Sequence, residues 1–226
     1  MNLVCFPPYG GGGYVCDVLN GTTSTNHKDG TVGNVLADSL KIAVPRSFRH
    51  FKSDNKLAYQ YFFQKKVQEI KDKFESHMWL GTHCYPDEVN MHEFDKVIVI
   101  STENVMSKIY RFMRVYFMYD SWAKMYSPNE DKTLNLEEKV GKIDLSLYNF
   151  NYHNVVQSNT IQLEMQDLIE DTPYFSKLID ETSYNRDPIY IKERKQNWQL
   201  KNYFLYDKNF VQIFENRYKQ YMETQK

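Results

Sequence analysis

The feature that most constrains this chain is a short apolar run followed by four glycines near its start. Residues 3–6 are continuously apolar, which is typical of a strand buried on both faces of a parallel sheet. Pro7 and Pro8 end this strand, and the glycines then let the backbone turn tightly. Apolar residues recur at helical spacing from Tyr14 to Leu19, and Gly21 is a suitable helix end. The pattern therefore predicts a strand, a glycine turn and a helix in direct succession.

A strand, a glycine turn and a helix N-terminus together form a geometry that binds phosphate. Open N–H donors and the positive end of the helix dipole point at one place. The open alternative is a turn that is only flexible. No Lys-Ser or Lys-Thr pair follows the glycines, which argues against an ordinary kinase or ATPase. The residues that define the predicted phosphate turn are Tyr9, Gly10, Gly11, Gly12, Gly13 and Tyr14.

Charge and composition exclude several classes of protein. The formal net charge of −1 argues against a strongly basic nucleic-acid-binding protein. Three cysteines without metal-ligand spacing predict a reducing compartment and no metal site. The sequence has no secretory signal pattern and no apolar run of about 18 residues, so we expect a soluble, cytoplasmic protein without a membrane partner. No linker divides the chain, so residues 1–226 are predicted to form one domain.

Strand and helix patterns alternate along the rest of the chain. Further strands are predicted at residues 78–82, 97–100 and 160–165. Helices are predicted at 56–75, 104–126 and 206–222, in pieces at 168–179 broken near Pro173, and in a short segment at 35–42. Residues 127–158 are polar and irregular. This alternation predicts an α/β fold with a central, mainly parallel sheet flanked by helices.

Three polar features follow predicted strands. The glycine turn follows the first strand, His83 follows the second, and residues 101–104, which include Ser101 and Thr102, follow the third. Ligands of such sheets bind beyond the carboxyl ends of the strands. We therefore expect these three segments to share one binding edge. The other histidines have no motif around them.

Several motifs resemble those of the cytosolic-type sulfotransferases. FPPYGGGGY is similar to the phosphate loop of that family, Tyr-Pro-Lys-Ser-Gly-Thr-Thr-Trp. GTHCYP at 81–86 is similar to Lys-Thr-His-Leu-Pro, and KVIVIS follows it as the family's next strand does. MQDL at 165–168 resembles Tyr-Glu-Asp-Leu. The tail from Arg194-Lys195 through Trp198 and KNYFLYDKNF resembles the family's Arg-Lys-Gly loop and Trp-Lys-Asn-His-Phe segment. The order and gaps fit over most of the chain.

The resemblance implies a fold, a cofactor and a reaction. It implies a three-layer P-loop-type domain that transfers a sulfuryl group from 3′-phosphoadenylyl sulfate (PAPS) and releases 3′,5′-bisphosphoadenosine. The acceptor would be a hydroxyl of a small molecule or glycan. In the family the histidine of Thr-His is the general base, and His83 matches it. That role requires a group that titrates near neutral pH.

The chain departs from the family pattern at the cofactor site. Pro8 stands at the loop lysine, Thr102 at the arginine that binds the 3′-phosphate, and the partner serine falls near Tyr110. The glycines after Arg194-Lys195 are missing. We therefore predict that Arg111, Arg194 and Lys195 contact the phosphates, because Arg binds phosphate in bidentate fashion. The alternative for Arg111 and Arg114 is that they are solvated helix charges.

Two further functions stay open at this stage. One is a non-catalytic or altered-specificity protein of the same fold that binds an anion or nucleotide. The other is a nucleotide or small-molecule kinase, which the missing Lys-Ser/Thr pair makes the weakest of the three.

Overall fold

The predicted first strand forms at the centre of a parallel sheet in the computed structural model of this chain. The structure describes residues 1–7, 10–20, 41–42, 64–65, 67–69, 79–82, 90–118, 134–143, 145, 158–183 and 187–225. Within them, the strands are β1 (Asn2–Cys5), β2 (Lys41–Ile42), β3 (Trp79–Thr82), β4 (Val97–Ser101) and β5 (Thr160–Glu164). Their order across the sheet is β2-β3-β1-β4-β5, and every described pair is parallel. The predicted α/β class with a parallel sheet is confirmed.

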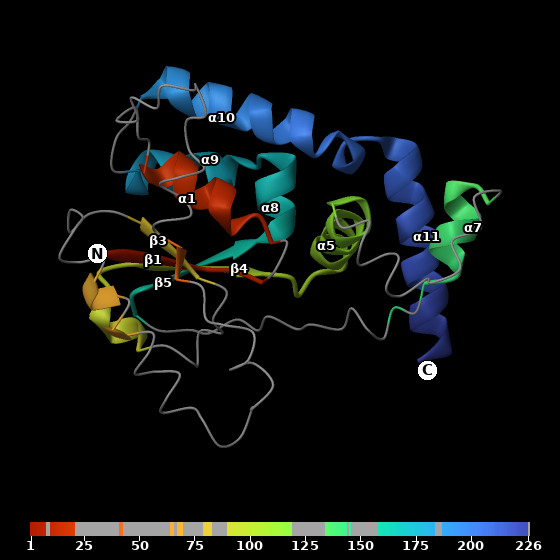
Figure 1. The fold of residues 1–226 in the computed structure, drawn as a ribbon, viewed down its shortest axis with the longest axis horizontal. Helices are drawn as coiled ribbons and strands as arrows, with labels where there is room; N and C mark the ends of the chain where they lie inside the picture. The colour runs from red at the N-terminus through yellow and green to blue at the C-terminus, as the bar shows by residue number, and fades with distance from the viewer. Residues whose placement is uncertain are drawn as a thin grey trace.

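Helices connect and cover these strands (Figure 1). α1 (Gly12–Asn20) follows β1, and α5 (Val105–Met118) follows β4. α8 (Met165–Glu170) and α9 (Pro173–Thr182) follow β5 and lie with α1 over one face of the sheet. α10 (Pro188–Lys201) lies across the outer side of α1 and α9. The other described elements are the helices α7 (Leu136–Gly141) and α11 (Lys208–Thr224) and the 3-10 turns η2 (Met91–Glu93) and η4 (Tyr203–Leu205).

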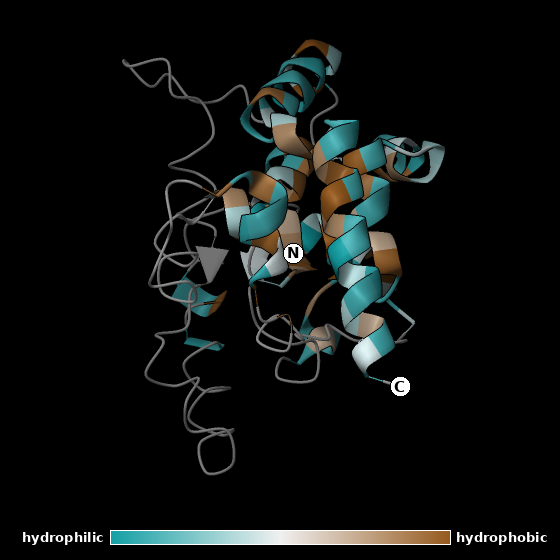
Figure 2. Cartoon of the chain, turned by 90° about the vertical axis from the view of Figure 1, so that its right-hand side faces the viewer, coloured by the Kyte–Doolittle hydropathy of each residue, from teal (hydrophilic) through white to brown (hydrophobic). Residues whose placement is uncertain are grey.

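The core lies between the sheet and the α1 layer. Val4 and Ile98 are fully buried in one cluster with Val15 and Val18 of α1 and Leu168 of α8. Side chains alternate between the two faces of a strand, so Leu3 and Val97 point to the other face, and they too are fully buried. Figure 2 shows the hydrophobic parts of the helices turned toward one another and the hydrophilic parts turned outward. Burial on both faces explains the continuous apolar runs of β1 and β4.

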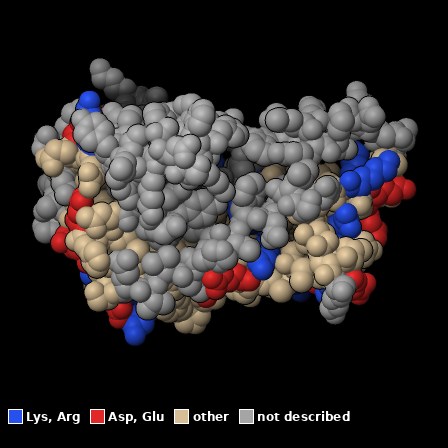
Figure 3. Space-filling model, turned by 90° about the horizontal axis from the view of Figure 1, so that it is seen from below, with Lys and Arg blue, Asp and Glu red and all other residues tan. Residues whose placement is uncertain are grey.

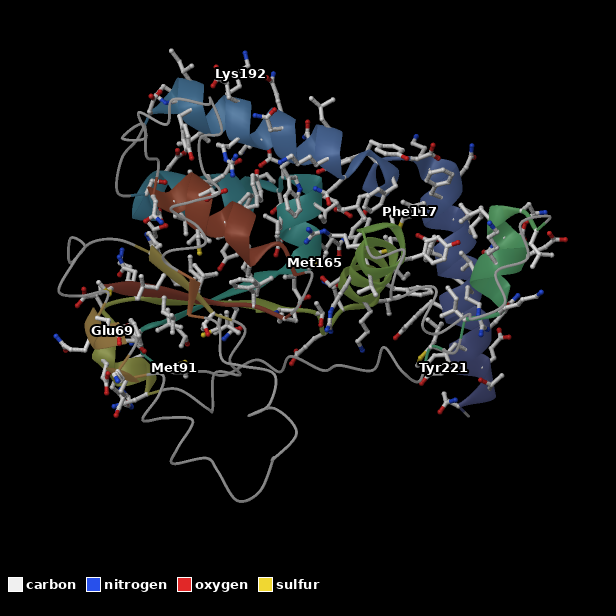
Figure 4. The ribbon with its side chains drawn as sticks, viewed as in Figure 1. Glu69, Met91, Phe117, Met165, Lys192 and Tyr221 are labelled. Carbon is white, nitrogen blue, oxygen red and sulfur yellow. The ribbon has the colours of Figure 1, made fainter. Side chains whose placement is uncertain are left out.

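A second group of apolar contacts joins α5 to the C-terminal helix. Phe117 stacks on Phe204 and Phe210, with ring centroids 4.5 and 5.3 Å apart. Phe214 packs edge-on against Phe112 at 4.8 Å. Figure 4 shows Phe117 on the side of α5 that faces α11. Phe210 and Phe214 therefore lie on the face of α11 that packs against α5.

The structure corrects part of the predicted secondary structure. The short helix predicted at 35–42 is wrong at Lys41 and Ile42, which form β2 beside β3. The other residues of that segment lie outside the described residues. In the helix predicted at 56–75, the described residues 64–65 and 67–69 are helical. Two helices of the structure, α7 and α10, were not predicted from the sequence. α7 lies within the polar segment 127–158, which has no clear helical pattern. α10 has no apolar stripe, and its apolar residues Ile189 and Leu200 are 69% and 73% exposed.

Candidate functional site

The glycine turn lies directly between β1 and α1, as the sequence predicted. Phe6 continues the pairing of β1 with β3, because its N–H donates to the carbonyl of Thr82 at 3.0 Å. The N–H of Gly10 then donates to the carbonyl of Pro7 at 2.8 Å and closes the turn. α1 begins at Gly12, and the N–H of Val15 donates to Gly11 at 3.2 Å. Pro8 and Tyr9 lie outside the described residues.

Close packing disfavours a side chain at three positions of this turn, and a Cβ on the first of them, Gly10, would lie 2.9 Å from the carbonyl oxygen of Pro7. Gly11 has φ +82°, and a Cβ there would lie 2.5 Å from Cδ2 of Leu168. A Cβ on Gly12 would lie 1.9 Å from the ring of Phe6. Gly13 is exposed, and a Cβ on it would meet nothing within 4 Å. The backbone of the turn thus packs closely against core side chains, which a turn that is only flexible would not do.

The first turn of α1 has no capping side chain, because the residue before it is Gly11. The structure gives the N–H groups of Gly11, Gly12 and Gly13 no acceptor among the described residues. Other described helices accept first-turn N–H groups with a side chain at the preceding position: Asn104, Asn135, Thr172, Asp187 and Asp207. Within the described part of the chain, the N-terminus of α1 therefore has N–H donors without an acceptor and the positive end of a helix dipole, a geometry that suits an anion.

The strand order places this turn at a topological switch point. After β1 the chain builds β2 and β3 on one side, and it then returns to build β4 on the other side. A crevice at the carboxyl ends of β1 and β4 is where open α/β sheets bind ligands. Cys5, the last residue of β1, pairs with Val99 of β4, so the turn that follows β1 lies next to the end of β4.

Thr102 lies at this edge with an unused hydroxyl. The residue is 1% exposed, and its Oγ1 has no hydrogen-bond partner among the described residues. Ile98 and Ile100 face the α1 layer, and Thr102 is the first residue after β4 ends at Ser101. A buried hydroxyl without a partner costs free energy. A ligand oxygen at this edge would satisfy it.

Ser101, which the sequence also placed at this edge, is already engaged. Its Oγ donates to Oε1 of Glu164 at 2.6 Å. Glu164 is the residue before α8, and its N–H donates to Oδ2 of Asp167 in that helix at 3.1 Å, so the Ser101–Glu164 pair links the ends of β4 and β5 to the start of α8. The role of Ser101 in the described structure is therefore to hold the end of the sheet.

Carboxylates neutralise two of the predicted phosphate-binding cations. Arg194 forms a salt bridge with Asp17, and both side chains are largely buried, at 16% and 9% exposed. Burial lowers the pKa of the Arg194 guanidinium from its ordinary value. Lys195 Nζ lies 2.6 Å from Oδ1 of Asp171 and 3.4 Å from Oγ of Ser176. Both residues fasten α10 to the layer below, and their phosphate contacts stay a prediction.

The arginines of α5 are buried, so the interpretation of them as solvated helix charges is wrong. Arg111 and Arg114 are each 6% exposed. Arg114 Nε donates to Oδ1 of Asn202 at 3.0 Å, and its guanidinium lies 4.4 Å from the ring centroid of Trp198. The predicted contact between Arg111 and a phosphate stays a prediction.

His83 itself lies outside the described residues. The strand before it forms as predicted and ends at Thr82, which is fully buried and pairs with Cys5 of β1. The residue that precedes His83 is thus adjacent to the last residue of β1.

Sequence analysis missed an aromatic contact over the turn. Tyr14 stacks on Trp198 with ring centroids 4.6 Å apart and an interplanar angle of 16°. Burial, with the nearby Asp171 and Tyr206, raises the pKa of the Tyr14 phenol, so it stays neutral. The partners come from distant segments, and no local pattern signals their contact.

Among the described residues, neither the surface charges nor the metal-ligating side chains form a second candidate site. Figure 3, which shows the lower side, has the described acidic and basic side chains mixed around its margin. The described residues contain no group of three or more His, Cys, Asp or Glu placed to bind a metal ion. In the same part of the chain, no helix has the length and apolarity needed to span a membrane.

Comparisons with protein-family models, curated proteins and solved structures found no match to this chain.

Proposed function

We propose that this chain is a P-loop-type protein that binds a phosphate-bearing ligand, a nucleotide, at the glycine turn. One observation carries the proposal: the uncapped N-terminus of α1 adjoins the strand edge where Thr102 keeps a buried hydroxyl without a described partner. Backbone N–H groups and a hydroxyl are donors, and phosphate oxygens are acceptors. The donor set therefore fits a phosphate group.

Three described cations, Arg114, Arg194 and Lys195, already contact other side chains of the chain, which makes them less suited to bind the phosphates of PAPS. Asp17 and Asp171 neutralise Arg194 and Lys195, and Arg114 is committed to Asn202 and Trp198. Pro8 and Thr102 replace two further cations of the sulfotransferase pattern. Transfer of a sulfuryl group needs stabilisation of developing negative charge. The geometry therefore supports nucleotide binding ahead of transfer.

PAPS-dependent sulfuryl transfer to a hydroxyl is the second candidate. The observation that favours it is the pairing of Thr82 with Cys5, since His83 is the next residue after Thr82. A base at that position would serve an acceptor bound at the same sheet edge as the turn.

Thermal shift with defined ligands tests the first proposal. We expect 3′,5′-bisphosphoadenosine to raise the melting temperature, with stabilisation that grows to about 2.7 kcal/mol at a hundred times the dissociation constant. A larger shift with ATP and magnesium would instead indicate a kinase-like ligand. No shift with either nucleotide, or with pyrophosphate, would reject the proposal.

A Thr102→Val variant localises the site, because valine keeps the shape and removes the hydroxyl. In the free protein we expect it to be neutral or to stabilise by about 1 kcal/mol, since an unpartnered buried hydroxyl is lost. Nucleotide affinity should fall by about tenfold, because a hydrogen bond to phosphate is lost. Equilibrium unfolding and calorimetric titration measure the two effects. Unchanged affinity would remove Thr102 from the site.

A His83→Ala variant tests the second candidate separately. Transfer of sulfuryl from PAPS to a panel of hydroxyl acceptors should be lost while 3′,5′-bisphosphoadenosine still binds. Absence of transfer by the unmodified protein would leave nucleotide binding as the function.

A further inference from the structure

A tryptophan of α10 lies against the glycine turn. Trp198 lies near the C-terminal end of α10 and packs against the core. A Cβ built on Gly11 would lie 3.1 Å from its Cη2 atom, so the indole is in close contact with the turn. Its ring also stacks on Tyr14, in the first turn of α1. One side chain therefore touches both the turn and the helix start.

Separate contacts hold Trp198 in this place. The guanidinium of Arg114 lies over its ring, 4.4 Å from the centroid. Asn202 accepts from Nε of Arg114 at 3.0 Å and donates from Nδ2 to the carbonyl of Trp198 at 2.8 Å. Asn202 is 1% exposed. The guanidinium of Arg114 thus contacts the indole directly, and Asn202 links that guanidinium to the backbone of Trp198.

α10 itself is anchored on the same layer. Arg194, four residues before Trp198, pairs with Asp17 of α1, and Lys195 pairs with Asp171 after α8. Figure 4 shows Lys192 on the opposite side of α10, turned away from this layer. These ion pairs therefore hold the inner side of α10 close to α1, where the indole of Trp198 packs against the turn.

We propose that Trp198 is the positioning residue of the glycine turn, which it orders in advance of nucleotide binding and couples to α5 and α10. This inference rests on the proposed nucleotide site. A turn that is ordered beforehand does not have to be ordered by the ligand, so affinity depends on the indole. Trp198 acts through its contacts with Gly11 and Tyr14, and we assign it no contact with the ligand.

The test uses the full chain with Trp198→Ala, Trp198→Leu and Trp198→Phe, and 3′,5′-bisphosphoadenosine as the probe. We expect the Ala and Leu variants to bind about tenfold more weakly, because the turn then has to be ordered on binding. Phenylalanine keeps an aromatic ring, so its affinity should stay within about threefold of the unmodified protein. The Leu variant serves if the Ala variant does not fold.

A matched control separates positioning from general destabilisation. Phe214→Leu removes a fully buried ring from the α5–α11 contact, and the described ring contacts of Phe214 are with Phe112, Tyr116 and Phe117, none of which belongs to the turn. It should lower stability and leave nucleotide affinity unchanged. In the unmodified protein the probe should also change tryptophan emission, and this change should vanish in Trp198→Phe.

A readout without ligand makes the inference independent of the nucleotide. The N–H of Val15 donates to the carbonyl of Gly11 and closes the first turn of α1. We expect its hydrogen exchange to be faster in Trp198→Leu than in Phe214→Leu. If the probe does not bind the unmodified protein, the proposed function fails and exchange at Val15 still decides the role of Trp198. Equal exchange in the two variants, or binding by Trp198→Leu at unchanged affinity, would overturn the inference.

Discussion

At the scale of single residues, the glycines that look alike in sequence differ in what surrounds them. Gly11 combines φ +82° with contacts to Leu168 and Trp198, and Gly12 faces the ring of Phe6. Gly13 has open space around its Cα. Gly11 is therefore fixed by packing and by its backbone conformation, and Gly12 is fixed by packing. Gly13 has room for a side chain.

This difference gives a matched pair of predictions. Gly12→Ala should destabilise the protein by about 1–3 kcal/mol, because its methyl group would overlap Phe6. Gly13→Ala should be neutral or stabilise by about 0.4–1 kcal/mol, since alanine restricts the unfolded chain and favours the helix. Urea unfolding of the two variants measures the contrast. Equal stabilities would mean that Gly12 is not packed against Phe6.

At the scale of elements, α10 depends on its contacts with other helices more than on its own sequence pattern. Its outer side carries exposed apolar residues, and its inner side carries two ion pairs and Trp198. Asp187 caps its first turn by accepting from the N–H groups of Ile189 and Tyr190. Tertiary contacts thus stabilise a helix that binary patterning does not indicate.

The Arg194–Asp17 pair gives the prediction at this scale. Arg194→Leu or Asp17→Leu alone should cost roughly 3–5 kcal/mol, because each leaves an uncompensated charge in a largely buried site. The double variant should lose much less than the sum, since no charge is left buried. A double-mutant cycle by urea unfolding measures the coupling. Additive effects would show that the two side chains are not paired in solution.

At the scale of the whole molecule, a buried thiol should make the free energy of unfolding fall as the pH becomes alkaline. Cys16 of α1 is 3% exposed, and burial raises its pKa from 9.0 to about 12. Above pH 9 the unfolded chain releases this proton first, while the folded protein keeps it. The contribution is therefore complete below about pH 9 and declines as the pH rises toward 12.

The unfolding free energy should fall with a slope of up to about 1.4 kcal/mol per pH unit from this one group. Urea unfolding under reducing conditions at pH 8, 9, 10 and 11 measures the slope. Cys16→Ala should flatten it, whatever that variant does to stability at pH 8. An equally steep slope without the thiol would assign the pH dependence to other groups.

The sequence by itself determined four of the five described strands, the class of fold and the position of the turn, and it missed only β2 among those strands. Residues 3–6 and 97–100 are uninterrupted apolar runs, and both form strands that are buried on two faces. The glycines after Pro8 indicated the turn because glycine favours such backbone conformations whatever the rest of the chain does. These signals are local, and a local pattern is readable without knowledge of distant partners.

Only the tertiary structure decided which charges the site retains. Asp17 and Arg194 come from opposite ends of the chain, and Arg114 meets a partner 88 residues away. Whether an arginine contacts phosphate or carboxylate depends on which neighbour folding brings to it, and no residue spacing encodes that choice. Thr102 gives a second example: the sequence shows that a hydroxyl is present, and only the fold shows that this hydroxyl is buried without a hydrogen-bond partner among the described residues.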